Sequence, residues 1–143
     1  MSSGSQTPPC FVDTNVWLYA FIPSQDPDKS DQAKAIIRHS DIIVSSQVIN
    51  EICVNLIKKA QFDEPAIQRL INSFYNRYNV TIVDKTTLLK ASELRERLQL
   101  SFWDSSIVSS ALLGGAEILY SEDMADGLLV ENRLRIVNPF SVK

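Results

Sequence analysis

Four acidic residues of this chain stand where an α/β fold can bring carboxylates together: Asp13, Glu51, Asp104 and Asp123. Asp13 and Asp123 each follow a short apolar run typical of a buried parallel strand, and ligands bind beyond the carboxyl ends of such strands. Two carboxylates about 4 Å apart repel by roughly 4 kcal/mol at an effective dielectric constant of about 20. A cluster of four would therefore need protonation or a cation, and oxygen ligands alone suit Mg²⁺ or Mn²⁺.

Each of these acids also has an ordinary structural explanation. Asp13 and Asp104 could each cap the helix that follows, since Asp commonly accepts backbone N–H bonds at a helix start. Glu51 could lie on the solvated side of a helix, and Asp123 could lie in a surface turn. The combination favours a metal site more than any single acid does, because a doubly wound sheet could bring all four to one crevice.

Strands and helices alternate along the sequence. Runs rich in β-branched residues predict five strands, at about residues 10–13, 41–45, 80–83, 117–120 and 134–137. Apolar periodicity and capping residues predict six helices, at about residues 14–21, 28–39, 46–57, 63–78, 84–99 and 105–113. This alternation predicts an α/β fold, a single-domain three-layer α/β/α sandwich with a mostly parallel five-stranded sheet.

Composition restricts the class of protein further. The 143 residues suit one domain, expected at residues 10–141, behind a disordered tail at residues 1–9. The net charge of -3 gives no strongly basic surface, so a polyanion would need a metal to approach the acids. We expect no membrane span and no signal peptide. We also expect Cys10 and Cys53 to be reduced thiols that pack in the core, and the protein to be located in the cytoplasm.

Four short motifs and a trailing segment carry a resemblance that covers the chain from about Cys10 to Phe140. They are Phe11-Val12-Asp13-Thr14-Asn15, Ser46-Gln47-Val48-Ile49-Asn50-Glu51-Ile52, Phe102-Trp103-Asp104-Ser105-Ser106-Ile107-Val108, Ser121-Glu122-Asp123-Met124-Ala125-Asp126-Gly127 and Ile136-Val137-Asn138-Pro139-Phe140. In this order, the motifs resemble the PIN-domain family, and within it the VapC-like toxins of bacterial toxin–antitoxin pairs. Each motif alone is loose, whereas the ordered set is specific.

The resemblance implies a metal-dependent endoribonuclease that uses one or two Mg²⁺ or Mn²⁺ ions to cut RNA. The residues implied for the site are Asp13, Glu51, Asp104 and Asp123 as catalytic metal ligands, Asp126 as a further or alternative ligand, and Asn15 and Ser121 as orienting residues. Asp104 or Asp123 would accept the proton of the attacking water. The sole histidine, His39, falls far from these acids in the sequence-based assignment. The implied partners are an RNA substrate, an antitoxin protein and a second copy of the chain.

Two other functions compete with this interpretation. The chain could be a catalytically inactive PIN-like module that binds RNA or a protein. It could also be an acid-rich phosphatase, although Asp13-Thr14-Asn15 lacks the second Asp expected two residues after a phosphatase nucleophile. The basic residues that could contact phosphates are Lys58, Lys59, Arg69, Arg77, Arg95 and Arg97, for which solvated helix faces are an equal explanation. Trp17 and Tyr19 could stack on bases, and a core position is favoured for Trp17.

Overall fold

A computed structural model of the chain describes residues 7–39 and 41–141. Its strands are β1 (Pro9–Val12), β2 (Asp41–Ser45), β3 (Asn79–Thr81), β4 (Ile118–Tyr120), β5 (Leu129–Val130) and β6 (Leu134–Val137). Its helices are α1 (Thr14–Phe21), α2 (Pro27–His39), α3 (Ser46–Ala60), α4 (Glu64–Arg77), α5 (Lys85–Leu98) and α6 (Phe102–Leu113). The tail expected at residues 1–9 lies mostly outside the described residues, and its last residue, Pro9, begins β1.

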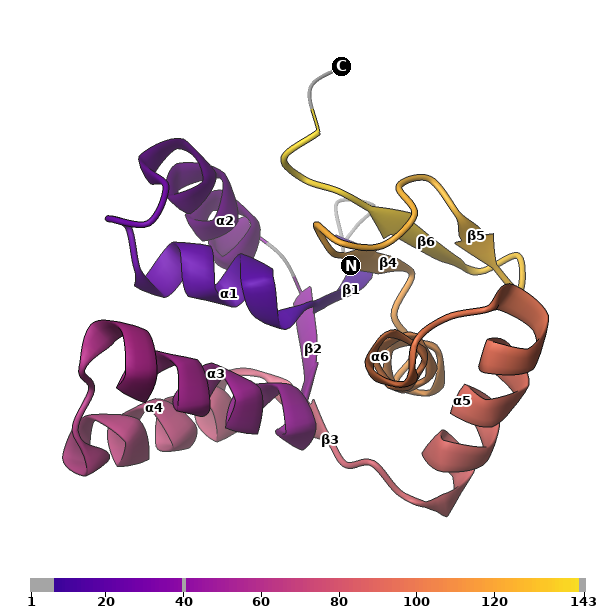
Figure 1. Ribbon diagram of the computed structural model, residues 1–143, viewed down its shortest axis with the longest axis horizontal. Coiled ribbons are helices and arrows are strands. Elements are labelled where there is room, and N and C mark those ends of the chain that lie inside the picture. The colour runs from indigo at the N-terminus through magenta and orange to yellow at the C-terminus, as the bar shows by residue number, and fades with distance from the viewer. Residues whose placement is uncertain (1–6, 40, 142–143) are drawn as a thin grey trace, which may run out of the picture.

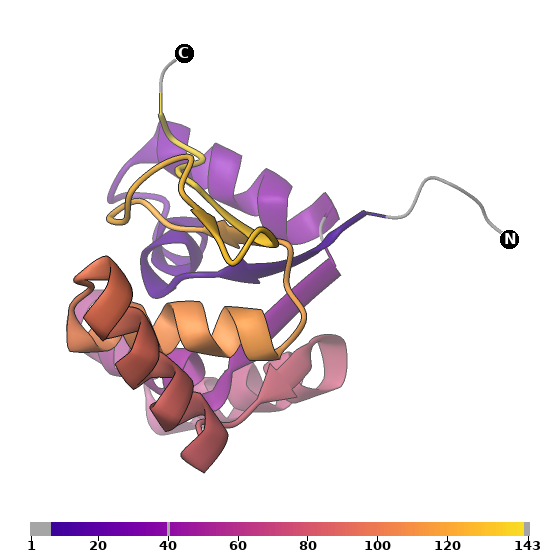
Figure 2. The ribbon, with the colours of Figure 1, turned by 90° about the vertical axis from the view of Figure 1, so that its right-hand side faces the viewer.

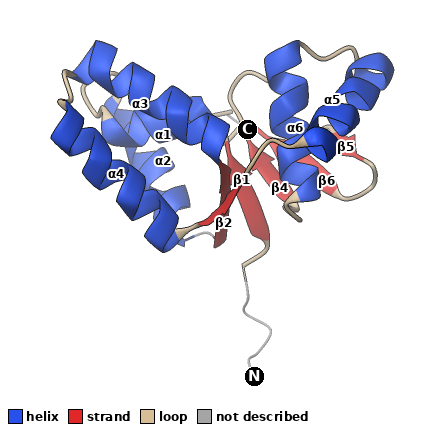
Figure 3. Ribbon diagram, turned by 90° about the horizontal axis from the view of Figure 1, so that it is seen from below, coloured by secondary structure: helices blue, strands red, loops and turns tan. Residues whose placement is uncertain are grey.

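Helices cover both faces of the sheet, as the alternating pattern predicted. Helices α1 to α4 form one group, and α5 and α6 form the other, with the strands between them (Figures 1 and 3). Figure 2 looks onto the side formed by α5 and α6. The three-layer α/β/α sandwich is therefore confirmed, and no helix in the described part of the chain is long and apolar enough to cross a membrane.

The strand order is β3-β2-β1-β4-β6-β5, and every pair is parallel except β5 with β6. The chain lays down β1, β2 and β3 in one direction and then places β4 on the other side of β1. Such a reversal of strand order opens a crevice at the carboxyl ends of the two strands concerned. Val12 of β1 pairs with Tyr120 of β4, so Asp13 and Ser121 leave the sheet side by side.

Two differences from the expected strands have simple causes. The sheet has six strands because the two-residue β5 forms a hairpin with β6, and so short a strand leaves no periodic signal. Glu131 and Asn132, both in the left-handed region, form its turn. The third strand ends at Thr81 because Thr81 pairs with Ser45, the last residue of β2, which leaves Ile82 and Val83 without a strand beside them.

The core lies on both faces of the central strand β1. Phe11 and Val12 have no exposed surface, and Trp17 of α1 donates its indole N–H to the Val12 carbonyl at 3.0 Å. The core position favoured for Trp17 is therefore confirmed. Cys10 and Cys53 are buried among the same core side chains, which agrees with packing roles.

Candidate active site

One cavity of about 420 Å³ is lined by all four of the predicted acids. Its lining residues are Asp13, Thr14, Asn15, Leu18, Glu51, Asn55, Lys59, Trp103, Asp104 and Asp123. They come from the end of β1, from α1, α3 and α6, and from the loop after β4. We call this space the acid cavity, and it lies at the crevice where the strand order reverses.

Asp13 is buried at the end of β1, with only 4% of its surface exposed. Its Oδ1 accepts the Thr14 backbone N–H at 2.7 Å, and its Oδ2 accepts the Ser121 hydroxyl at 2.9 Å. Burial raises the pKa of Asp13 to about 6, and the negative charges of Asp104 and Asp123 add to this, while the two hydrogen bonds oppose it. Asp13 is thus both a helix cap and part of the acid cluster.

Asp123 is held by the two residues that the resemblance assigned to orienting the site. Asn15 donates a side-chain N–H to its Oδ2 at 2.5 Å, and the Asp123 backbone N–H bonds to the Ser121 hydroxyl oxygen at 3.3 Å. Ser121 therefore contacts both Asp13 and Asp123, and Asn15 contacts Asp123 from the first turn of α1.

Asp104 does not cap its helix, contrary to the capping explanation. The helix begins at Phe102, three residues before the predicted start, because the Ser101 hydroxyl caps it by accepting the Asp104 backbone N–H at 3.1 Å. Capping therefore does not use the Asp104 carboxylate, which faces the acid cavity. Burial raises the pKa of Asp104, the negative charge of Asp123 raises it further, and the hydrogen bond with Ser101 opposes the shift.

Glu51 belongs to a polar stripe on α3 that faces the crevice rather than open solvent. Residues Glu51, Asn55 and Lys59 are four apart, so they lie on one side of the helix, and all three line the acid cavity. Asn55 donates an N–H to the Glu51 carboxylate at 3.2 Å. Lys59 brings a positive charge to a cavity otherwise rich in carboxylates. The sequence alone indicated only that Lys59 could contact phosphates, and not that it lies beside these acids.

The other acids of the Ser121–Gly127 segment point elsewhere. Glu122 forms an ion pair with Lys29 of α2 and accepts the Tyr19 hydroxyl at 2.8 Å. Asp126 accepts the Asn138 backbone N–H at 2.9 Å and does not line the acid cavity. Asp123 is therefore the acid of this segment that the fold brings to Asp13.

The donor set suits a hard divalent cation, since four carboxyl groups line one cavity and a cation would offset the burial that raises the pKa of Asp13. In the geometry described for residues 7–39 and 41–141, no three His, Cys, Asp or Glu side chains stand close enough together to hold a metal ion. The lining acids would have to turn toward one another to share an ion. Asp104, Glu51 and Asp123 are only partly buried or exposed, which leaves them room to do so.

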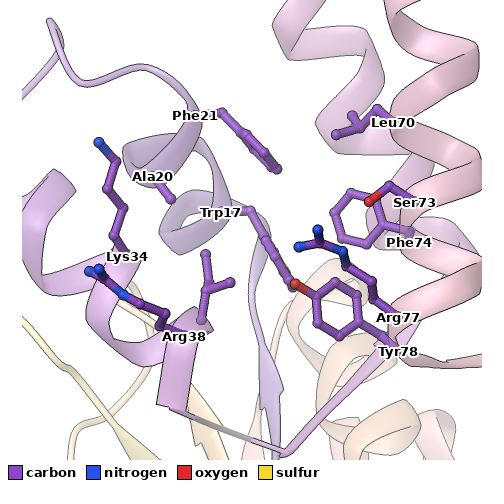
Figure 4. Close-up of a pocket in the computed structure, with 11 residues that line it drawn as sticks. Trp17, Ala20, Phe21, Lys34, Arg38, Leu70, Ser73, Phe74, Arg77 and Tyr78 are labelled. Atoms are coloured by element: carbon purple, nitrogen blue, oxygen red, sulfur yellow. The ribbon is translucent and has the colours of Figure 1, made fainter.

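A second cavity, of about 540 Å³, lies between α1, α2 and α4 (Figure 4). Aromatic side chains line it, including Trp17 and Phe74. Three cations stand around them, Lys34 and Arg38 from α2 and Arg77 from α4. No acidic residue is among the described residues that line this cavity, so its charge is opposite to that of the acid cavity.

A comparison with protein families matches residues 10–125 to the PIN domain. Comparison with curated protein sequences gave no significant match. Among solved structures, a toxin–antitoxin complex from Klebsiella pneumoniae superposes with a TM-score of 0.70 at 18% identity, covering 93% of this chain and 99% of that one. The sarcin–ricin loop cleaving toxin VapC20 of Mycobacterium tuberculosis has a TM-score of 0.64 at 19% identity, over 80% of this chain and 89% of its own. VapBC2 of Rickettsia felis, bound to a promoter DNA fragment, has a TM-score of 0.62 at 19% identity, over 91% and 99%.

The raised pKa of Asp13 predicts a pH-dependent cost to the metal-free fold. Because the pKa is about 6 in the folded chain against 3.8 for the ordinary group, stability is lost as pH rises from about 4 to 6 and stays lost at neutral pH. Asp13→Asn should therefore raise the free energy of unfolding at pH 7.5 by up to about 3 kcal/mol. Urea denaturation with a chelator present, at several pH values, measures this difference. A gain that is equally large at pH 4 and pH 7.5 would contradict the assignment.

Proposed function

Because this chain belongs to the PIN domain family, we propose that it is a metal-dependent endoribonuclease, the toxin of a toxin–antitoxin pair. The observation that carries the proposal is the convergence of Asp13, Glu51, Asp104 and Asp123 on one cavity. These acids lie at the carboxyl edge of the sheet, where α/β proteins bind ligands. The fold is also that of solved toxins, including one that cleaves the sarcin–ricin loop of RNA.

The four carboxylates are the residues that would hold Mg²⁺ or Mn²⁺. When bound, such an ion supplies Lewis-acid stabilisation of phosphate charge and lowers the pKa of a coordinated water. The chain's own residues then have separate tasks. Hydrogen bonds from Thr14 and Ser121 hold the buried Asp13 carboxylate, and a hydrogen bond from Asn15 orients Asp123.

Hydrolysis of a phosphodiester also needs a group that accepts a proton from the attacking water. We assign this to Asp104 or Asp123, because both face the cavity without the double hydrogen bonding that holds the Asp13 carboxylate. The pKa of Asp104 is raised toward neutral pH. A general base is most effective when its pKa lies near the pH at which the enzyme works. Lys59, an exposed residue that lines the cavity, can attract the phosphate of the approaching RNA.

An antitoxin partner and a homodimer complete the proposed toxin, and we place its action in the cytoplasm. The similar structures include toxin–antitoxin complexes, which motivates the partner. The cavity between α1, α2 and α4 offers aromatic walls with Lys34, Arg38 and Arg77 around them (Figure 4). A protein segment that carries apolar side chains among acidic ones would match both its walls and its charge.

Cleavage of RNA tests the proposed activity. Purified protein with Mg²⁺ or Mn²⁺ should cut single-stranded RNA, and a chelator should stop it. Asp13→Asn and Asp104→Asn should each lower the rate roughly 100-fold or more, because each removes a carboxylate from the cluster. Product analysis on denaturing gels measures the rate.

The matched control for these variants is Asp31→Asn, which removes an exposed carboxylate of α2 and should leave cleavage unchanged. Asp126→Asn should retain most of the activity, whereas Asp123→Asn should lose it. Cleavage that survives both Asp13→Asn and Asp104→Asn would exclude the proposed site. RNA binding without cleavage by the native chain would favour the inactive module, and release of phosphate from a small phosphoester alone would favour a phosphatase.

Metal binding should also stabilise the fold, because a cation removes the repulsion among the acids. A Mn²⁺ concentration about 100 times the dissociation constant should raise the melting temperature by roughly 5–10 °C. Differential scanning fluorimetry measures the shift, which should shrink in Asp104→Asn and persist in Asp31→Asn. An equal shift in all three proteins would mean that the ion binds elsewhere.

The proposed antitoxin partner predicts that the affinity of the complex depends on the positive charges around the cavity between α1, α2 and α4. The product of the gene beside this one should copurify with the chain and inhibit its cleavage of RNA. The charge reversal Arg38→Glu should weaken that complex roughly tenfold or more, because it removes part of the complementary charge around the cavity. Surface plasmon resonance measures the affinity. The control is Lys58→Glu, which reverses the charge of an exposed residue of α3 outside this cavity. Equal weakening by both reversals would indicate only long-range attraction.

A further inference from the structure

A groove of about 730 Å³ lies beside the acid cavity, between the start of α3, the segment after β3, and helices α5 and α6. We call it the aromatic groove and define it by Gln47, Ile82, Arg95, Phe102, Trp103 and Ser106. Trp103 lines both this groove and the acid cavity, so the two spaces lie on either side of this residue's position and are neighbours. A chain bound in the acid cavity is therefore next to the groove.

Phe102 is the most unusual residue of the groove, since 76% of its surface is exposed. One side of its ring carries the Arg95 guanidinium, whose central carbon is 3.9 Å from the ring centroid. Arg95 is itself fixed, because it donates an N–H to the Ser105 hydroxyl at 2.8 Å. The ring is thus held by a cation that cannot swing away easily, and it keeps a large surface open to a ligand.

The chemistry of the groove suits nucleobases. Among the described residues that line it, none is acidic, and Arg95 supplies a positive charge. The Ser106 hydroxyl donates to Gln47 Oε1 at 3.0 Å, which leaves the side-chain N–H groups of Gln47 to donate to the edge of a base. Aromatic rings, an arginine and amide groups are the features with which proteins stack and contact unpaired bases.

We propose that the aromatic groove binds the bases of a single-stranded RNA whose backbone crosses the acid cavity. The inference rests on the proposed nuclease function and adds the place on this chain where the bases of its substrate would bind. Phe102, Trp103 and Asp104 are consecutive residues in the first turn of α6, so one turn supplies two stacking surfaces and one acid. Bases inside a duplex have their faces covered by their neighbours, so the groove selects unpaired segments.

The experiment compares RNA binding and cleavage by the native chain with Phe102→Ala, Phe102→Leu and Phe102→Tyr. Leu89→Ala is the matched control, since Leu89 is an apolar side chain of α5 with 57% exposure outside the groove. Phe102→Ala should raise KM for single-stranded RNA roughly tenfold or more, with a smaller change in kcat. Phe102→Leu should behave like Phe102→Ala, while Phe102→Tyr and Leu89→Ala should match the native chain. Duplex RNA of the same sequence should bind weakly to all of them.

Fluorescence provides a readout that does not depend on cleavage. Of the two tryptophans, Trp17 is 1% exposed in the core and Trp103 lies at the groove, so quenching by acrylamide reports mainly on Trp103. Single-stranded RNA added to the Asp13→Asn protein should protect Trp103 from acrylamide, and this protection should fall in the Asp13→Asn, Phe102→Ala double variant.

The outcomes distinguish a failure of the aromatic groove as a base-binding site from a failure of the proposed ribonuclease function. If the native chain cleaves RNA while Phe102→Ala keeps the native KM and Trp103 stays unprotected, the groove proposal is wrong and the nuclease survives. If the native chain does not cleave RNA under any metal condition, the proposed function itself fails and the groove proposal falls with it. If Phe102→Ala turns a dimer into a monomer in light scattering without changing RNA affinity, the groove is instead a protein interface, which overturns the proposal.

Discussion

The Asp13 carboxylate is buried at the end of the central strand β1, and the rest of the site depends on how it is held there. The pairing of Val12 with Tyr120 brings the Ser121 hydroxyl to one of its oxygens, and the start of α1 brings the Thr14 N–H to the other. These two hydrogen bonds offset only part of the burial cost, so the pKa stays raised. The same sheet register that positions Asp13 also positions Asp123 through Ser121.

The cluster is consequently a place where charge repulsion lowers the stability of the fold. Asp104 and Asp123 add negative charge around an acid that already resists ionisation. Carboxylates that repel one another in this way are found in proteins mainly at sites that bind a cation or perform acid–base chemistry. Lys59, which also lines the cavity, reduces the charge imbalance, and the exposed position of Asp123 keeps part of the cluster in high dielectric.

Helix α6 connects the acid cavity with the aromatic groove. Its body is buried on several sides, with Ile107, Val108 and Ala111 among the core residues, so its first turn is fixed in place. The Ser101 cap sets where that turn begins and thereby directs Phe102, Trp103 and Asp104 to their different surroundings. A helix beginning at Ser105 would place none of these three side chains in a defined helical turn.

Local sequence determined most of the elements and the identity of the acids. Apolar runs, Asp63 before Glu64-Pro65 and Asp84 before α5 mark strand and helix positions that recur in the structure, because capping and burial act over a few residues. Asp13 and Asp123 could be selected because each follows a strand, Asp104 because it lies at the start of a helix, and Glu51 because it projects from the helix after β2. All four line one cavity.

Only the tertiary structure decided which neighbouring acid faces the cavity and what surrounds it. Glu122 pairs with Lys29 and Asp126 caps the backbone at Asn138, partners that are remote in sequence and invisible to periodicity. The end of β3 depends on where β2 ends, and the exposure of Phe102 depends on Arg95 from another helix. The sequence by itself thus determined most of the elements, because short-range forces set them, and the order of its motifs gave the candidate ligands. Pairing across the sheet and between helices decided their geometry, because contacts between distant segments exist only in the folded chain.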